Sequence, residues 1–274
     1  LLLSPNKKDK YIKIASGDYV PFLQDGTSGY SFVLEKPDVG NLEYSTKSLT
    51  LRGGYPNNIT GTDVAMDNLR DPILYPTYIR GNRSDSKHLV YIDESMDTAG
   101  ENGALAPVNI EGFTFVGGNA ADATGEGSTG AAVYLNKGNI YNTVLHSNKA
   151  WGLALNGTGN IVSNTIANNS KGGLYARGAL VAEPLQIYNN IFWRNYTSAV
   201  PTVGDLNNQI DVQNATLYSN AVQVDDATAE QPNAEYVYWN SSAGVVLGDK
   251  AANINKTLSS DNEDMSYGPR FEAP

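Results

Sequence analysis

The chain has 274 residues, of which 41% are hydrophobic and 18% charged, so it is long and apolar enough to form a folded core. Its formal net charge is −10, and the absence of a basic cluster argues against nucleic acid and against an anionic membrane surface as partners. The absence of cysteine excludes disulfides, thiol catalysis and zinc–thiolate sites.

The N-terminal part, to about residue 45, contains the strand-like pieces Tyr11–Ile14 and Ser31–Leu34 and is predicted to form an irregular first coil or cap. Leu1–Leu3 is too short for a signal peptide or a membrane span. We therefore expect a processed or excised fragment that does not itself insert into a membrane. Residues 62–76 interrupt the pattern that follows and are predicted to form a loop.

An internal repeat extends from about residue 46 to residue 247. Four nine-residue segments align without gaps, and the third residue of each is asparagine. One further step gives a fifth position, and the intervals of 22 to 26 residues separate Asn142, Asn164, Asn189, Asn214 and Asn240. In three earlier segments glycine takes this place, at Gly53, Gly81 and Gly112.

The repeat predicts a solenoid because asparagine and glycine both tolerate the left-handed backbone of a tight turn. Stacked asparagines also exchange amide hydrogen bonds with the coils on either side. Apolar residues two positions before the asparagine and three after it alternate in the manner of strands that point inward. We predict an all-β, single right-handed parallel β-helix of about seven or eight coils, with the five asparagines forming one ladder at a corner.

A second strand precedes the first in each coil, at Gly130–Leu135, Gly152–Leu155 and Gly172–Tyr175. Beyond Leu247 the period is lost. The prediction is therefore one domain over residues 1–274, with a cap at 1–45, regular coils at 46–247 and an irregular segment at 248–274.

Catalytic candidates are few. The adjacent acids Asp225 and Asp226 follow a predicted strand, and neighbouring strand residues face opposite ways, which weakens them as a catalytic pair. Gly125–Gly130 matches a nucleotide-binding glycine pattern but lacks the flanking strand and helix, so a flexible turn is expected instead of a nucleotide site. With two histidines and no cysteine, no metal site or cofactor is expected, although acids that hold calcium stay an alternative.

Aromatic residues beside the repeated asparagine give the stronger candidates for a binding surface. By strand alternation, two outward sets are expected to bind a ligand, namely Tyr141, Tyr188 and Trp239, and His146, Trp193 and Tyr218. Stacking of the coils is expected to place Trp193 over Tyr218 and close to His146. The alternative is that loops cover these rings, which would then extend the core.

The pairing of a Gly-Gly-Ala-aliphatic strand with a Phe-x-x-Asn strand is similar to the polymorphic outer-membrane protein repeats of bacterial surface proteins. It is seen here in Gly130–Val133, Gly172–Leu174 and Phe192–Asn195. The stretches Gly53–Pro56 and Ile110–Ala120 resemble pectin-lyase-like β-helix surface proteins of gut and oral bacteria. The resemblance covers roughly residues 11–247.

This resemblance implies a secreted or cell-surface bacterial module, extracellular or on the outer surface, which contacts a glycan or a host or cell-surface protein without catalysis. A polysaccharide lyase or glycoside hydrolase of the same superfamily is the first alternative, but the sequence motifs of polygalacturonases are absent. A purely structural scaffold is the second.

Overall fold

The computed structural model describes residues 10–21, 32–35, 49–57, 63–81, 88–93, 108–119, 132–135, 137–149, 151–178, 185–193, 195, 210–213, 215–218, 220–222, 237–238 and 254–256. Within these segments the protein is all-β apart from one short helix, α1 (Asp63–Asn68). The strands form three sheets of eight, eight and six strands, which we call sheets A, B and C. None of the helical structure in these segments is long and apolar enough to cross a membrane.

The strands of each sheet are stacked in chain order. Sheet A contains β1 (Lys10–Ala15), β4 (Leu49–Tyr55), β7 (Val108–Glu111), β10 (Gly138–Tyr141), β13 (Asn160–Val162), β16 (Leu185–Tyr188), β19 (Ala215–Tyr218) and β22 (Ile254–Lys256). Sheet B contains β2 (Gly17–Tyr19), β5 (Thr77–Arg80), β8 (Thr114–Val116), β11 (Val144–His146), β14 (Thr165–Ala167), β17 (Ile191–Trp193), β20 (Ala221–Val222) and β21 (Val237–Tyr238). Sheet C contains β3 (Phe32–Glu35), β6 (Val90–Asp93), β9 (Val133–Leu135), β12 (Trp151–Gly157), β15 (Gly172–Gly178) and β18 (Ile210–Gln213).

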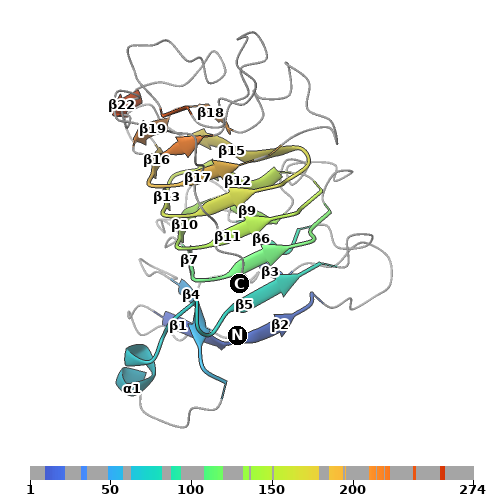
Figure 1. The fold of residues 1–274 in the computed structure, drawn as a ribbon, viewed down its shortest axis with the longest axis vertical. Coiled ribbons are helices and arrows are strands. Elements are labelled where there is room, and N and C mark those ends of the chain that lie inside the picture. Colours follow the sequence, from blue (N-terminus) through green and yellow to red (C-terminus); the bar gives the residue numbers. More distant parts are fainter. Residues whose placement is uncertain are drawn as a thin grey trace, which may run out of the picture.

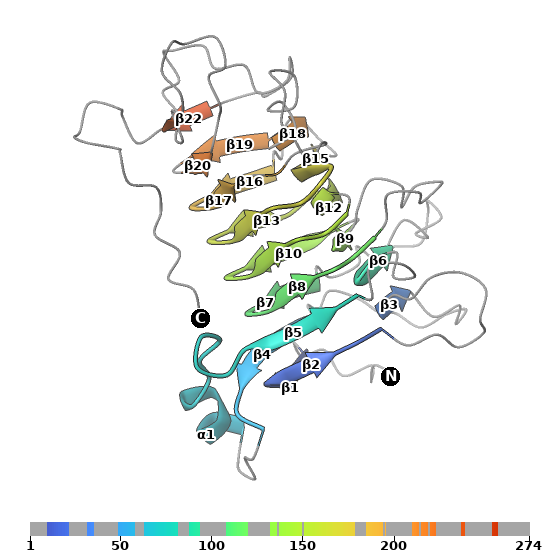
Figure 2. The ribbon, with the colours of Figure 1, turned by 45° about the vertical axis from the view of Figure 1, so that its right-hand side comes forward.

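The chain visits the three sheets in turn, so β10, β11 and β12 are followed by β13 directly beside β10 (Figure 1). Every pair of neighbouring strands is parallel except β20 with β21. Figure 2 shows the resulting stack of strands side by side. Apart from the β20–β21 pair, this parallel arrangement is compatible with the predicted parallel β-helix, because consecutive strands that change sheet can pair only with strands one coil away.

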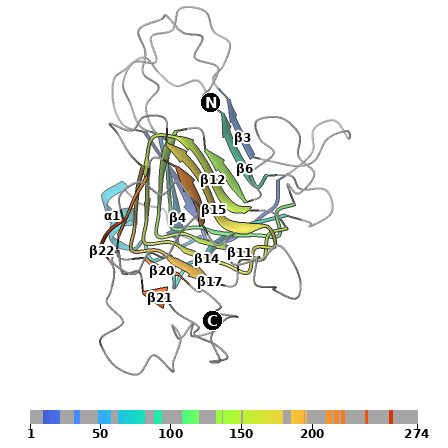
Figure 3. The same cartoon turned by 90° about the horizontal axis from the view of Figure 1, so that it is seen from above.

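The three sheets surround one central space (Figure 3), and their buried apolar side chains form one core cluster. Alternate residues of β7, β10, β13 and β16 point inward, and the same inward position is fully buried in these four successive strands of sheet A, at Ile110, Ile140, Ile161 and Ile187. Phe115, Leu145, Ile166 and Phe192 form the equivalent row in sheet B. Burial of such aliphatic and aromatic side chains is the main stabilising contribution to the stack.

Two corners connect sheet A to sheet B and sheet B to sheet C. The first residue of each corner has a positive φ, with values of 76° at Gly112, 47° at Asn142, 57° at Ser163 and 56° at Asn189 for the first corner. The second corner has φ values of 80° at Gly117, 55° at Ser147 and 54° at Asn168. Glycine, asparagine and serine occupy these positions because bulky side chains disfavour the left-handed backbone.

After the left-handed residues at 147, 163, 168 and 189, the next residue is a buried asparagine that belongs to a ladder. At the first corner the Asn164 amide donates to Asn190 at 3.0 Å, and the Asn190 amide donates to Asn220 at 2.9 Å. At the second corner Asn148 donates to Asn169 at 2.8 Å, and Asn169 donates to Asn195 at 2.9 Å. The protein thus has two asparagine ladders, which satisfy backbone and amide groups that would otherwise be buried without partners.

The predicted single ladder was therefore wrong in detail. Asn164 belongs to a ladder, but Asn142 and Asn189 are the exposed left-handed residues one position earlier. The ungapped alignment failed because successive coils differ in length, and the bonded positions at the first corner are 21, 26 and 30 residues apart. Asn214 and Asn240 lie outside the described residues.

Two further expectations are corrected by the strand pairing. Gly81 follows β5 of sheet B, so it lies at the second corner and not at the first with Gly112, whereas Gly53 lies inside β4. The segment predicted as a loop at 62–76 contains α1, which lies outside the ring of strands on the side of β4 and β22 (Figure 3).

Candidate functional site

The outer face of sheet A carries one row of residues in register across five strands. Glu111 pairs with Tyr141, Tyr141 with Val162, Val162 with Tyr188, and Tyr188 with Tyr218. Glu111, Tyr141, Val162 and Tyr188 are partly exposed, whereas the isoleucine immediately before each of them in the chain is fully buried. We call Tyr141, Val162 and Tyr188 the tyrosine row, because strand alternation turns all three away from the core.

A second row of side chains runs parallel to the tyrosine row, two residues earlier in each strand. The amide of Asn109 donates to Thr50 at 3.1 Å, that of Asn139 donates to Asn109 at 2.7 Å, and that of Asn160 donates to Asn139 at 2.7 Å. Gln186 occupies the next register position. Asn109, Asn139, Asn160 and Gln186 are partly exposed and form an amide row, in which each of the three asparagine amides donates toward the N-terminal end of the sheet.

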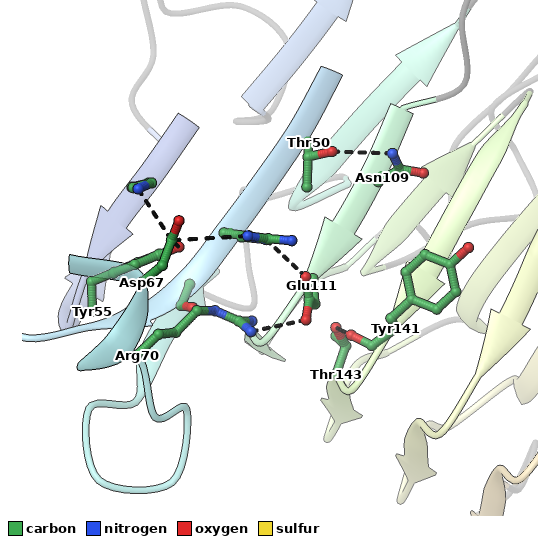
Figure 4. Close-up of polar contacts among 11 residues, drawn as sticks. Thr50, Tyr55, Asp67, Arg70, Asn109, Glu111, Tyr141 and Thr143 are labelled. Carbon is green, nitrogen blue, oxygen red and sulfur yellow. Dashed lines mark hydrogen bonds and ion pairs between the residues drawn. The ribbon is translucent and has the colours of Figure 1, made fainter. Parts of the chain in front are cut away.

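A cluster of charges lies at that N-terminal end, where α1 docks on the outer face of sheet A (Figure 4). Glu111 binds two arginines, with its carboxylate oxygens 3.0 Å from Arg52 Nε and 2.8 Å from Arg70 Nη1. Asp67 of α1 lies 3.1 Å from Lys13 Nζ and accepts a hydrogen bond of 2.7 Å from the Tyr55 hydroxyl. The cluster therefore joins the α1 segment to three successive strands of the sheet.

Arg70 is positioned by glycine. Its Nε donates to the carbonyl oxygen of Gly53 at 2.9 Å, and its Nη2 lies where a Cβ on Gly112 would come within 2.4 Å. Gly112 also has the positive φ of the first corner, so a larger residue here would be strained and would displace the guanidinium. The corner itself accepts asparagine or serine in other coils, so it is the contact with Arg70 that sets glycine apart at this position.

The cluster perturbs several ionisation equilibria. Burial and the hydrogen bond to Asp67 raise the pKa of Tyr55 to about 12. The same hydrogen bond, followed by the ion pair with Lys13, lowers the pKa of Asp67. Burial opposes the charge on Arg52, but Glu111 and Tyr55 outweigh it and raise the Arg52 pKa. At neutral pH Arg52 is consequently protonated, Asp67 is ionised and the Tyr55 phenol is neutral, so none of these three groups is poised to transfer a proton.

The predicted binding residues fall on two different sheets. Tyr141, Tyr188 and Tyr218 occupy one register line of sheet A, whereas His146 and Trp193 are partly exposed on sheet B and separated by Ala167. The expected stacking of Trp193 over Tyr218 was wrong, because the coil between them is longer than the alignment assumed. Trp239, Asp225 and Asp226 lie outside the described residues.

The charged cluster was not predicted from the sequence. Arg52 and Glu111 stand immediately before Gly53 and Gly112 in the aligned segments, and opposite charges at one repeat position were a signal for an ion pair between coils. Asp67 and Arg70 gave no such signal, since their contacts depend on how an insertion outside the repeat docks.

In the described segments no three His, Cys, Asp or Glu side chains are grouped to hold a metal ion. The arrangement instead offers two aromatic faces, a row of amides and a paired charge cluster, which suit contact by stacking and hydrogen bonding. The sequence matches no protein-family model, and no curated protein and no solved structure shows significant similarity to it.

Proposed function

We propose that the protein is a non-catalytic contact module, secreted or displayed on a bacterial surface, that binds a glycan or a protein through the outer face of sheet A. Its fold is proposed to be a right-handed parallel β-helix of the pectin-lyase-like type, in keeping with the strong right-handed preference of parallel crossover connections. The supporting observation is the tyrosine row, in which two outward tyrosines flank a smaller valine across consecutive strands.

The paired charges favour binding over catalysis. Both carboxylate oxygens of Glu111 are engaged by arginines, so neither is free to contact a substrate. Tyr55, with a pKa of about 12, is equally unsuited as a base at neutral pH. A rigid sheet presenting aromatic rings, by contrast, binds without having to order its side chains, and this lowers the entropic cost of contact.

The test is a binding panel of plant, bacterial and host glycans together with cell-surface proteins. A ligand should bind the wild-type protein, and Tyr141→Ala or Tyr188→Ala should weaken binding about tenfold, which corresponds to about 1.4 kcal/mol for a lost ring contact. Tyr78→Ala removes a partly exposed tyrosine from the outer face of sheet B and is the matched control. Depolymerisation of a panel glycan, or ligand binding that is insensitive to both sheet A variants, would overturn the proposal.

A further inference from the structure

The spacing of the two tyrosines along the stack indicates which kind of ligand the tyrosine row fits. Tyr141 and Tyr188 stand on strands separated by one intervening strand, β13, which presents the smaller Val162. Neighbouring strands lie about 4.8 Å apart, so the two tyrosine positions are separated by roughly 10 Å along the stack. This separation is close to the two-sugar repeat of a flat, extended β-1,4-linked chain, in which equivalent sugar faces recur at every second unit.

The amide row repeats on every strand, whereas the tyrosines occur on every second strand. Asn139, Asn160 and Gln186 occur on every strand from β10 to β16, beside the tyrosine row. The hydrogen bonds among Thr50, Asn109, Asn139 and Asn160 hold these amides in one direction at the surface. Amides at one-strand spacing can donate to and accept from hydroxyl groups of each successive sugar.

The charge distribution selects a neutral chain. Strands β10, β13 and β16 contain no charged residue at all. The nearest carboxylate in the row, Glu111, is already bound by Arg52 and Arg70. Within these three strands an anionic polymer would therefore meet no cation, and the net charge of the protein is −10.

Resting on the proposed function, we infer that the ligand is a neutral β-1,4-linked glycan of the glucan, mannan or xylan class, lying along the stack across β10, β13 and β16. Alternate sugars stack on Tyr141 and Tyr188, and the sugar between them lies over Val162. Asn139, Asn160 and Gln186 bond the hydroxyl groups along one edge of the chain. The α1 segment closes the N-terminal end of this path through the Arg70–Glu111 contact.

The inference is tested by calorimetric titration with cellohexaose, mannohexaose and xylohexaose. Maltohexaose, whose α-1,4 linkages curve the chain, and hexagalacturonate, which is charged, are the comparison probes. At least one neutral β-1,4 hexaose should bind at least tenfold more tightly than both comparison probes and than its own disaccharide, which is too short to reach both rings. Tyr141→Ala and Tyr188→Ala should each abolish this length dependence, whereas Tyr141→Phe should keep it and Tyr78→Ala should leave it unchanged.

The outcomes separate this inference from the proposed function. Equal or tighter binding of maltohexaose or hexagalacturonate, no binding of any neutral β-1,4 hexaose, or length dependence that survives both alanine variants would overturn the inference. If a cell-surface protein then binds in a manner that depends on Tyr141 and Tyr188, the proposed function still holds. If no ligand depends on either tyrosine, both fail.

Discussion

Each corner of the stack requires different properties of two neighbouring residues. The first must accept a positive φ, and the second must supply a buried amide that bonds to the coils on either side. Asparagine meets both requirements, which explains the Asn189–Asn190 and Asn168–Asn169 pairs. A repeated asparagine therefore predicts a corner correctly, but does not by itself say which of its two positions is occupied.

Substitution of the two adjacent asparagines should separate these roles. Asn190→Leu leaves the Asn164 backbone N–H and one of its two side-chain N–H donors without their acceptor, whereas Asn220 loses the side-chain donor but keeps the Asn190 backbone N–H. Because each buried group left unsatisfied costs about 1–3 kcal/mol, we expect unfolding to become easier by roughly 3 kcal/mol or more. Asn189→Gly, which retains the left-handed backbone, should change the free energy of unfolding by less than about 1 kcal/mol. Urea unfolding measures both, and equal losses would contradict the assignment of the ladder.

The ion cluster holds α1 and the residues that follow it against the outer face of sheet A. Glu111 is 19% exposed and holds Arg52 and Arg70 together, so Glu111→Gln should remove the ion-pair partner of the part-buried Arg70 and leave Arg52 with only its longer contact of 3.9 Å to Asp67. We expect a loss of about 1–3 kcal/mol and faster amide hydrogen exchange in residues 63–75. Asp18→Asn removes a much more exposed ion pair with Arg80 and should cost less than about 0.5 kcal/mol. Unchanged exchange in Glu111→Gln would show that other contacts hold α1.

The docking of α1 should also depend on acid pH. The hydrogen bond from Tyr55 lowers the pKa of Asp67 from its ordinary value of 3.8, so the contact stabilises the folded state above that pH. The stabilisation is lost as the pH falls through the lowered value. Tyr55→Phe removes the largest cause and should return the Asp67 pKa toward 3.8, as followed by NMR of the carboxyl carbon. An unchanged midpoint would mean that Lys13 and Arg52 alone set the ionisation.

For the whole molecule, the regular features of the fold could be predicted and the irregular ones could not. Alternation of apolar residues around Ile140 and Ile187 correctly predicted inward-facing strands, because every coil repeats the same packing. The outward direction of Tyr141 and Tyr188 followed from the same alternation. The pairing of Trp193 could not be predicted, because loops of different length alter the register without altering the local pattern.

The tyrosine row and both corners rest on one strand register, in which residues 21 positions apart lie side by side in β10–β13 and β11–β14. This register places Tyr141 beside Val162 and creates the tyrosine row. The ungapped alignment of the sequence instead pairs Tyr141 with Ser163 and Val144 with Ile166.

Disulfide cross-linking between β11 and β14 distinguishes these registers most directly, because the natural chain contains no cysteine. Val144 and Thr165 are paired and partly exposed on the same face, whereas Ile166 is fully buried on the opposite face. We predict that Val144→Cys with Thr165→Cys forms a disulfide under mild oxidation and that Val144→Cys with Ile166→Cys does not. A disulfide in the second variant and none in the first would contradict the register and, with it, the row of tyrosines on sheet A.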